Sequence, residues 1–204
     1  MGQFLARIFA SIFPIWRLDS FVGLISSLVL DGTRAFIANE GLIKQLTAPL
    51  SIHVYTIVWS NLIVFLHNVW IYFLVALWFG KVPDWPMLLM IPALAILLFN
   101  GVWVALLLGL LSARFRDIPQ IVASIVQVMF FLTPVIWTPE MLPGRALILD
   151  LNPFYYFIEL VRAPLLGQVP SAQIFLGIAV ITVTGWICAI IFYTIYRWRL
   201  AYWV

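Results

Sequence analysis

Ala113-Arg114-Phe115-Arg116-Asp117-Ile118-Pro119 is a short polar turn inside a very apolar chain. Apolar stretches flank it on both sides, at about 87–112 and 119–137. A helix needs about 20 apolar residues to cross the hydrocarbon core of a membrane, and both stretches are close to that length. Asp117 suits the cap of the second helix, and Pro119 suits its first turn. The sequence therefore predicts two membrane-crossing helices joined by a basic turn.

Three more long apolar stretches lie outward from this pair, at about 19–37, 50–79 and 172–196. As a helix, the stretch 50–79 would be about 45 Å long, so it should tilt or protrude from the bilayer. In the whole chain, 65% of the residues are hydrophobic and only 9% are charged, whereas a soluble domain carries about 25% charged residues. We therefore expect an all-α, polytopic membrane protein with about five transmembrane helices.

The N-terminal residues 1–18 differ from the rest. They hold a short apolar stretch, Phe4 to Trp16, which Arg7 and Pro14 interrupt. The stretch has the length of a signal-peptide core but lacks a clean small-residue cleavage site. We expect an amphipathic segment that lies in the membrane interface, followed by one transmembrane domain at residues 19–204.

Lysine and arginine are unevenly divided between the two sides of these spans. One side carries Arg34, Lys44, Arg114, Arg116, Arg197 and Arg199, and the other carries Lys81, Arg145 and Arg162 among several acidic residues. By the positive-inside rule, the first side and the C-terminus are cytoplasmic. There is no basic cluster with interleaved aromatic residues, so a nucleic-acid partner is not expected.

The energy source can be argued by elimination. The chain has no Gly-x-x-x-x-Gly-Lys-Ser/Thr loop for the phosphates of ATP. The deep positions of the spans hold Asn61, His67, Asn68, Asn100 and Gln127 but no carboxylate. Asp31 comes nearest, and its spacing lets it pair with Arg34. Because ion-driven carriers usually keep ionisable groups deep in their spans, we expect a separate ATP-binding subunit. We assign no cofactor, metal site or catalytic residue to this chain.

A separate ATPase needs a mechanical contact on the cytoplasmic side, and the connector at residues 39–49 is the first candidate. It is long enough for a helix of two or three turns that Pro49 stops. We expect the apolar residues of this helix to cluster on one face, namely Leu42, Ile43 and Leu46. Glu40 and Lys44 lie four apart near the other side. The second candidate is the polar turn at residues 114–119, in which Arg114, Arg116 and Asp117 would contact the ATPase. For residues 39–49 the alternative is an ordinary interfacial connector. For the second connector it is a positive-inside anchor plus a helix start, which is compatible with a coupling role.

On the opposite side, the chain from Trp137 to Val169 is too polar and too rich in proline to cross a membrane. Residues 154–158 are nevertheless apolar enough to dip back into it, and Glu159 and Arg162 are spaced to pair on one face of a short helix. Irregular backbone at that depth requires protein or a water-filled cavity around it. We expect a re-entrant hairpin that lines or plugs a pathway. A periplasmic loop with a structural ion pair is the alternative.

Aromatic residues suggest what passes through. The long second span carries Tyr55, Trp59, Trp70 and Phe73 along one side, and the third span carries Phe99 and Trp103 four residues apart. Aromatic faces can stack on sugar rings without fixing which sugar is present. We predict that these residues line a substrate channel, with helix packing or lipid contact as the alternative.

Four short motifs occur in order along the chain: Ala113–Pro119, Thr133-Pro134, Asn152-Pro153 and the Glu159/Arg162 pair. Their order and spacing resemble the membrane-spanning permease of bacterial ABC exporters for polysaccharide and polyol phosphate, which move O-antigen, capsule and teichoic acid. The resemblance runs from about Gly23 to the C-terminus. That family normally begins with a cytoplasmic amphipathic helix and one further span, which residues 1–18 do not match.

The resemblance implies a multi-pass protein of the bacterial inner membrane. It implies a homodimer that works with two copies of a separate ATP-binding subunit, and a lipid-linked polysaccharide such as O-antigen as cargo. In such exporters the connector at residues 39–49 is a coupling helix seated in the ATP-binding subunit. The resemblance also implies a periplasmic gate, made of Thr133, Pro134, Asn152, Pro153, Glu159 and Arg162.

Three other functions remain open at this point. The first is a drug or small-lipid ABC exporter permease, and the second is a membrane-embedded enzyme acting on lipid-linked sugars. Such an enzyme should gather carboxylates or histidines at one membrane face. Here the outer acids are scattered, and His53 and His67 lie in one span. The third is a membrane scaffold that transports nothing.

Overall fold

The computed structural model describes residues 20–45, 49–78, 85–132, 152–165 and 168–203. Every regular element within these ranges is a helix, which confirms the all-α prediction. The elements are the helix Ser20–Thr33, α2 (Glu40–Gln45), α3 (Ser51–Trp78), the 3-10 helix η1 (Trp85–Leu89), α4 (Met90–Arg114), α5 (Ile118–Leu132), α7 (Pro153–Leu165), α8 (Ala172–Tyr196) and α9 (Leu200–Trp203). The expected interfacial segment at 1–18 lies outside the described residues.

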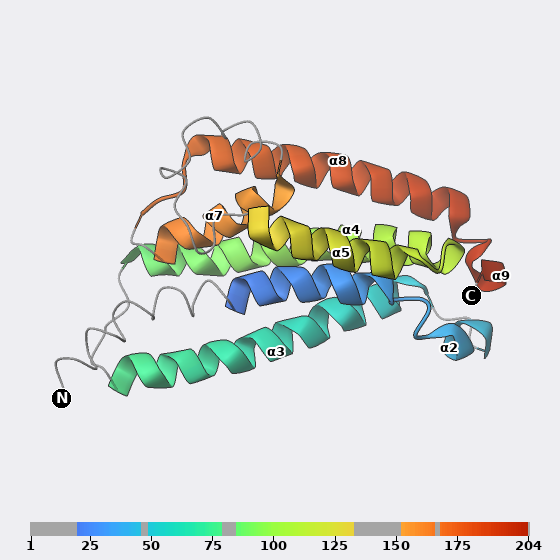
Figure 1. The fold of residues 1–204 in the computed structure, drawn as a ribbon, viewed down its shortest axis with the longest axis horizontal. Helices are drawn as coiled ribbons and strands as arrows, with labels where there is room; N and C mark the ends of the chain where they lie inside the picture. Colours follow the sequence, from blue (N-terminus) through green and yellow to red (C-terminus); the bar gives the residue numbers. More distant parts are fainter. Residues whose placement is uncertain (1–19, 46–48, 79–84, 133–151, 166–167, 204) are drawn as a thin grey trace.

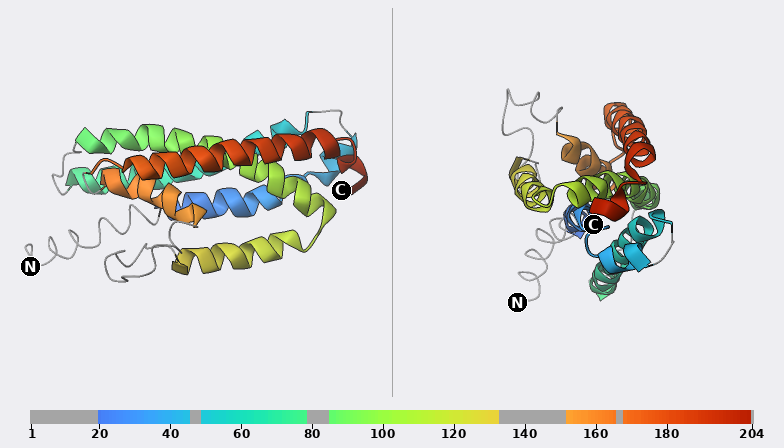
Figure 2. Two further views of the ribbon diagram at one scale, coloured as in Figure 1. Left: turned by 90° about the horizontal axis from the view of Figure 1, so that it is seen from above. Right: turned by 90° about the vertical axis from the view of Figure 1, so that its right-hand side faces the viewer.

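The long helices run side by side along the long axis of the molecule (Figure 1). Helix α4 contacts α3, α5, α7, α8 and α9, so it is the central helix of the bundle. Helices α2 and α9 lie together at one end, called the α2 end below (Figures 1 and 2).

Three of the helices are long and apolar enough to cross a membrane: residues Ser51–Trp70 of α3, all of α4 and all of α8. The two other predicted spans appear as shorter apolar helices, Ser20–Thr33 and residues Ile118–Phe130 of α5. The structure does not describe the residues directly before the first helix or directly after α5. The first ends four residues before the predicted end at 37. There the backbone tightens, because the Arg34 and Ala35 amides bond to carbonyl oxygens three residues back, at 2.9 and 3.2 Å.

Small residues allow the helix Ser20–Thr33 to lie very close to α4. Gly101, Ala105 and Gly109 follow one another at intervals of four on α4. Leu28 lies against Gly101, and a Cβ placed on Gly32 would stand only 2.8 Å from the Cα of Ala105. Lipid tails are as apolar as the side chains, so close van der Waals packing of this kind holds helices together in a membrane.

Buried side chains form two core clusters. The first, between the helix Ser20–Thr33, α3, α4, α7 and α8, contains Phe21, Val22, Leu24, Ile25, Leu28, Val58, Phe65, Ala93, Leu97, Ile158, Leu160, Val161, Ile174 and Ile178. The second, toward the α2 end, contains Ala35, Phe36, Val54, Ala105, Leu110, Ala113 and Leu200. Leu200 of α9 is 0% exposed, so the C-terminal residues are anchored in the second cluster.

Two polar contacts join helices inside the bundle. The Asn100 Oδ1 atom accepts hydrogen bonds from the Trp103 indole at 2.8 Å and from the Thr182 hydroxyl of α8 at 3.0 Å. The Asn61 amide of α3 donates to the Asp31 carboxylate at 3.0 Å. Asp31 thus has an interhelical partner in place of the predicted Arg34. The helix ends at Thr33, so Arg34 no longer continues its face.

Candidate functional site

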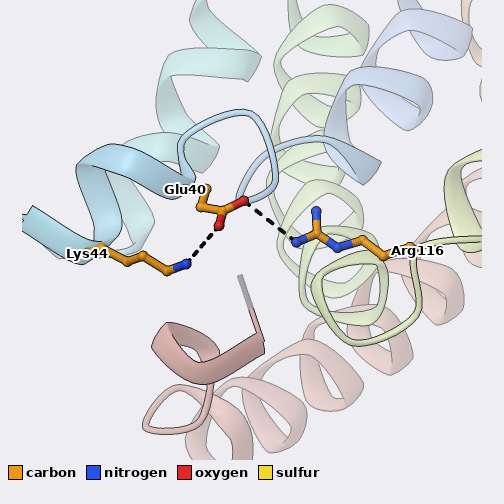
Figure 3. Close-up of polar contacts among 3 residues, drawn as sticks. All are labelled: Glu40, Lys44 and Arg116. Atoms are coloured by element: carbon orange, nitrogen blue, oxygen red, sulfur yellow. Dashed lines mark hydrogen bonds and ion pairs between the residues drawn. The ribbon is translucent and has the colours of Figure 1, made fainter.

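The two predicted coupling connectors meet at the α2 end, where one carboxylate contacts both (Figure 3). Glu40 is the first residue of α2, and its Oε1 atom lies 2.7 Å from the Lys44 ammonium one turn later. Its Oε2 atom lies 3.7 Å from the guanidinium of Arg116, in the connector between α4 and α5. The fold therefore brings together two connectors that are far apart in the sequence.

The local sequence explains why α2 begins where it does. The Asn39 carbonyl accepts the Ile43 amide at 3.0 Å, and the Asn39 side chain donates to the Ala35 carbonyl at 2.8 Å. An acidic residue in the first turn and a basic residue in the last turn both suit the helix dipole, and their spacing of four lets them pair. These favourable terms help to stabilise a helix of six residues.

Lys44 dominates the electrostatics of Glu40. Its hydrogen bond and then its charge hold the pKa of the Glu40 carboxyl below the usual value, and Arg116 adds a smaller effect in the same direction. All three side chains are about half exposed. Exposed ion pairs contribute little to stability, so the bridge shows where the two connectors meet and adds little to the stability of the fold.

The apolar residues of α2 face in different directions. Ile43 packs against the second core cluster, whereas Leu42 is 50% exposed. Leu46 lies outside the described residues. The predicted single apolar face is therefore divided, because the protein uses Ile43 in its own core and leaves Leu42 available.

The connector between α4 and α5 adds an exposed aromatic residue that the sequence reasoning missed. The Arg114 guanidinium lies 5.6 Å from the ring centre of Phe115 and 5.4 Å from that of Trp203 in α9, both within cation–π range. The Asp117 carbonyl accepts the Gln120 and Ile121 amides, each at 3.1 Å, at the start of α5. The sequence signal that could have found Phe115 was its place between two arginines at the end of a predicted span.

The name α2 platform is used below for the surface formed by Glu40, Leu42, Lys44, Phe115, Arg116 and Asp117. Four of these residues are predicted coupling residues that the structure leaves exposed: Leu42, Lys44, Arg116 and Asp117. The platform combines the ion pairs of Glu40 with Lys44 and Arg116 with two exposed apolar side chains, Leu42 and Phe115. Such a surface can seat another protein through shape and charge together.

The predicted gate residues that the structure describes lie in α7 or, for Asn152, directly before it. Asn152 is buried, and its Oδ1 atom accepts the Phe154 amide at 2.9 Å, while Pro153 is the first residue of the helix. Asn-Pro is thus a helix start. Glu159 and Arg162 form the predicted pair at 3.7 Å, and burial raises the pKa of Glu159 while Arg162 opposes this shift. Thr133 and Pro134 lie outside the described residues.

The predicted channel aromatics fall on two separate surfaces. Tyr55, Trp59 and Trp70 are exposed along α3, whereas the side chain of Phe73 is not described. Phe99 and Trp103 instead face α8. The Phe99 ring lies 5.0 Å from that of Trp186, and a Cβ on Gly185 would stand 2.4 Å from the Trp103 ring. Within one chain, the structure does not bring the two groups together.

Apolar spanning helices and a polar platform at one end of the bundle define a multi-pass α-helical membrane protein. Residues 21–166 match the ABC-2 type transporter family, and the chain belongs to this family of transport permeases. It is also similar to the O-antigen export system permease protein RfbA of Myxococcus xanthus, with 25% identity over 179 residues that cover 83% of this chain and 69% of that protein.

Proposed function

We propose that this chain is the permease subunit of an ATP-driven exporter that moves a lipid-linked polysaccharide of the O-antigen class across the bacterial inner membrane. Membership of the ABC-2 type transporter family supports the transport role. The similarity to the O-antigen export permease of Myxococcus xanthus supports the cargo class. Two copies of the chain would work with two ATP-binding subunits, in the closed two-fold arrangement that is the commonest for assemblies of one chain among soluble oligomers.

The observation that carries this proposal is the Glu40–Arg116 contact at 3.7 Å. It ties the two connectors of the α2 end into one surface, so a single ATP-binding subunit seated there would move both. Helix α2 lies in the chain between the helix Ser20–Thr33 and α3, and the second connector joins α4 to α5. A displacement of the α2 platform would therefore reach four helices at once.

The predicted pathway elements belong to the same proposal. Exposed Tyr55, Trp59 and Trp70 on α3 supply stacking faces for sugar rings, provided that a second copy or another element encloses them. The α7 pair Glu159–Arg162 would act at the outer mouth. This requires the α2 end to be cytoplasmic, in agreement with the arginine and lysine residues on that side.

Three substitutions at the α2 platform test the coupling role. Leu42→Asp, Arg116→Glu and Glu40→Gln each alter an exposed or half-exposed side chain, so we expect normal abundance in the membrane. We expect Leu42→Asp and Arg116→Glu to reduce both co-purification of the ATP-binding subunit and surface polysaccharide by at least about tenfold, and Glu40→Gln to have a smaller effect. A tenfold loss corresponds to about 1.4 kcal/mol of docking free energy.

Val169→Asp is the matched control, because Val169 is 71% exposed against 50% for Leu42 but lies in the connector before α8, away from the platform. It should leave export and co-purification unchanged. Normal export and normal co-purification in all the platform variants would contradict the coupling assignment. The cargo class alone would be contradicted if the wild type bound the ATP-binding subunit normally but exported a different lipid and placed no polysaccharide on the cell surface.

A further inference from the structure

The chain ends in a compact turn at residues 197–203, called the C-terminal turn below. After α8 the backbone bends through three hydrogen bonds, in which the amides of Arg197, Arg199 and Tyr202 donate to Tyr193, Tyr196 and Arg199 at 2.9, 2.9 and 3.0 Å. Leu200 then enters the second core cluster and is 0% exposed. The turn is therefore a fixed part of the fold.

Two aromatic and two basic side chains of the C-terminal turn are exposed. Trp198 and Tyr202 are 74% and 88% exposed. The Arg197 guanidinium lies 4.7 Å from the ring centre of Trp198, and both Arg197 and Arg199 are exposed. Tryptophan and tyrosine favour the headgroup level of a membrane. The turn follows directly on the apolar α8, so its position in the chain matches that level.

Arg197 and Arg199 take part in no ion pair within the ranges that the structure describes. In the described part of the chain, the ion pairs are Glu40 with Lys44 and Arg116, and Glu159 with Arg162. A guanidinium presents a planar fork of N–H donors that fits phosphate oxygens well. An exposed pair of such groups at headgroup depth is suited to a phosphate on a lipid.

We propose that the C-terminal turn binds the phosphate of an anionic phospholipid such as phosphatidylglycerol. Arg197 and Arg199 would hold the phosphate, with Trp198 and Tyr202 in the headgroup layer beside it. Leu200 fixes the turn from the inside, so binding would not require the turn to order first. A phospholipid is favoured over an acidic protein because the site lies where the membrane surface supplies the ligand at high local concentration.

The same turn is linked to the α2 platform through Arg114. The Trp203 ring lies 5.4 Å from the Arg114 guanidinium, which in turn lies over Phe115 of the platform. The lipid would therefore bind beside the docking surface, and this part of the inference rests on the proposed function of the platform. Lipid binding itself does not depend on that function, so the two can fail separately.

The test uses the full chain in nanodiscs of phosphatidylcholine, alone or mixed with phosphatidylglycerol. Bound lipid is counted by native mass spectrometry. We expect the wild type to retain phosphatidylglycerol, and each of Arg197→Gln and Arg199→Gln to weaken this binding about fivefold. The double variant should lose most of it. Arg197→Lys with Arg199→Lys should retain an intermediate amount, because the charge remains but the fork is lost.

Arg34→Gln is the control for location, since it removes an exposed positive charge between the helix Ser20–Thr33 and α2 and outside the C-terminal turn. It should bind phosphatidylglycerol as the wild type does. Equal loss in Arg34→Gln, equal retention of phosphatidylcholine, or full displacement of the lipid by inorganic phosphate would each overturn the proposal. If the Arg197 and Arg199 variants lose the lipid but co-purify with the ATP-binding subunit as the wild type does, only the link to the platform is removed.

Discussion

Gly32 is the residue at which the helix Ser20–Thr33 comes closest to α4. Any side chain there would meet the backbone of Ala105 at 2.8 Å, and backbone cannot move aside as a flexible side chain can. The spacing of Gly101, Ala105 and Gly109 on α4 is visible in the sequence, but the sequence does not say which residue of which helix lies against it. That information comes only from the packed bundle.

We predict that Gly32→Val lowers the stability of the protein by about 1–3 kcal/mol, because it overpacks this contact. The loss should appear as reduced abundance in membranes and an earlier unfolding transition in detergent. Gly23→Val is the matched control in the same helix, since a Cβ at Gly23 meets nothing within 4 Å. Equal effects of the two substitutions would show that helix propensity, and not the close contact, determines the result.

At the scale of elements, apolar length predicted the order of the long helices, since a membrane span must satisfy its own backbone hydrogen bonds. The all-α class is confirmed. Side-chain direction was less accessible. In a helix of six residues, neighbouring Leu42 and Ile43 point about 100° apart, so only the surrounding core decides which one is buried. Likewise, Asp31 finds Asn61 on another helix, and no local spacing reveals such a partner.

The contact between α4 and α8 permits an ordered prediction for two substitutions. Asn100→Leu removes the acceptor of the Trp103 indole and leaves that N–H unpaired, which costs about 1–3 kcal/mol. Thr182→Val removes one interhelical hydrogen bond, worth about 0.6 kcal/mol in membrane proteins. Thermal unfolding of the two single variants and of the double variant gives the interaction energy between Asn100 and Thr182. A greater loss in Thr182→Val than in Asn100→Leu would contradict the assigned roles.

For the whole molecule, the distribution of lysine and arginine makes a topological prediction. Reporter fusions after Lys44, after Ser112 and at the C-terminus should read cytoplasmic, because basic residues cluster on that side. Fusions after Lys81 and Gly144 should read periplasmic. A cytoplasmic signal at Gly144 would place the segment before α7 on the wrong side for an outer gate. The fusions use activity reporters that function on one side of the membrane only.

The hydrogen bonds around Asn100 also bear on how the bundle can move. The Asn100 amide donates to the Ile96 carbonyl at 2.9 Å, and Trp103 bonds to Asn100 within the same helix. The Thr182 hydroxyl lies 2.7 Å from the Ile178 carbonyl of its own helix, closer than its 3.0 Å to Asn100. If α8 withdrew from α4, each of these groups would keep a partner on its own helix. Separation of the two helices would thus leave none of these three groups, Asn100, Trp103 and Thr182, without a hydrogen-bond partner.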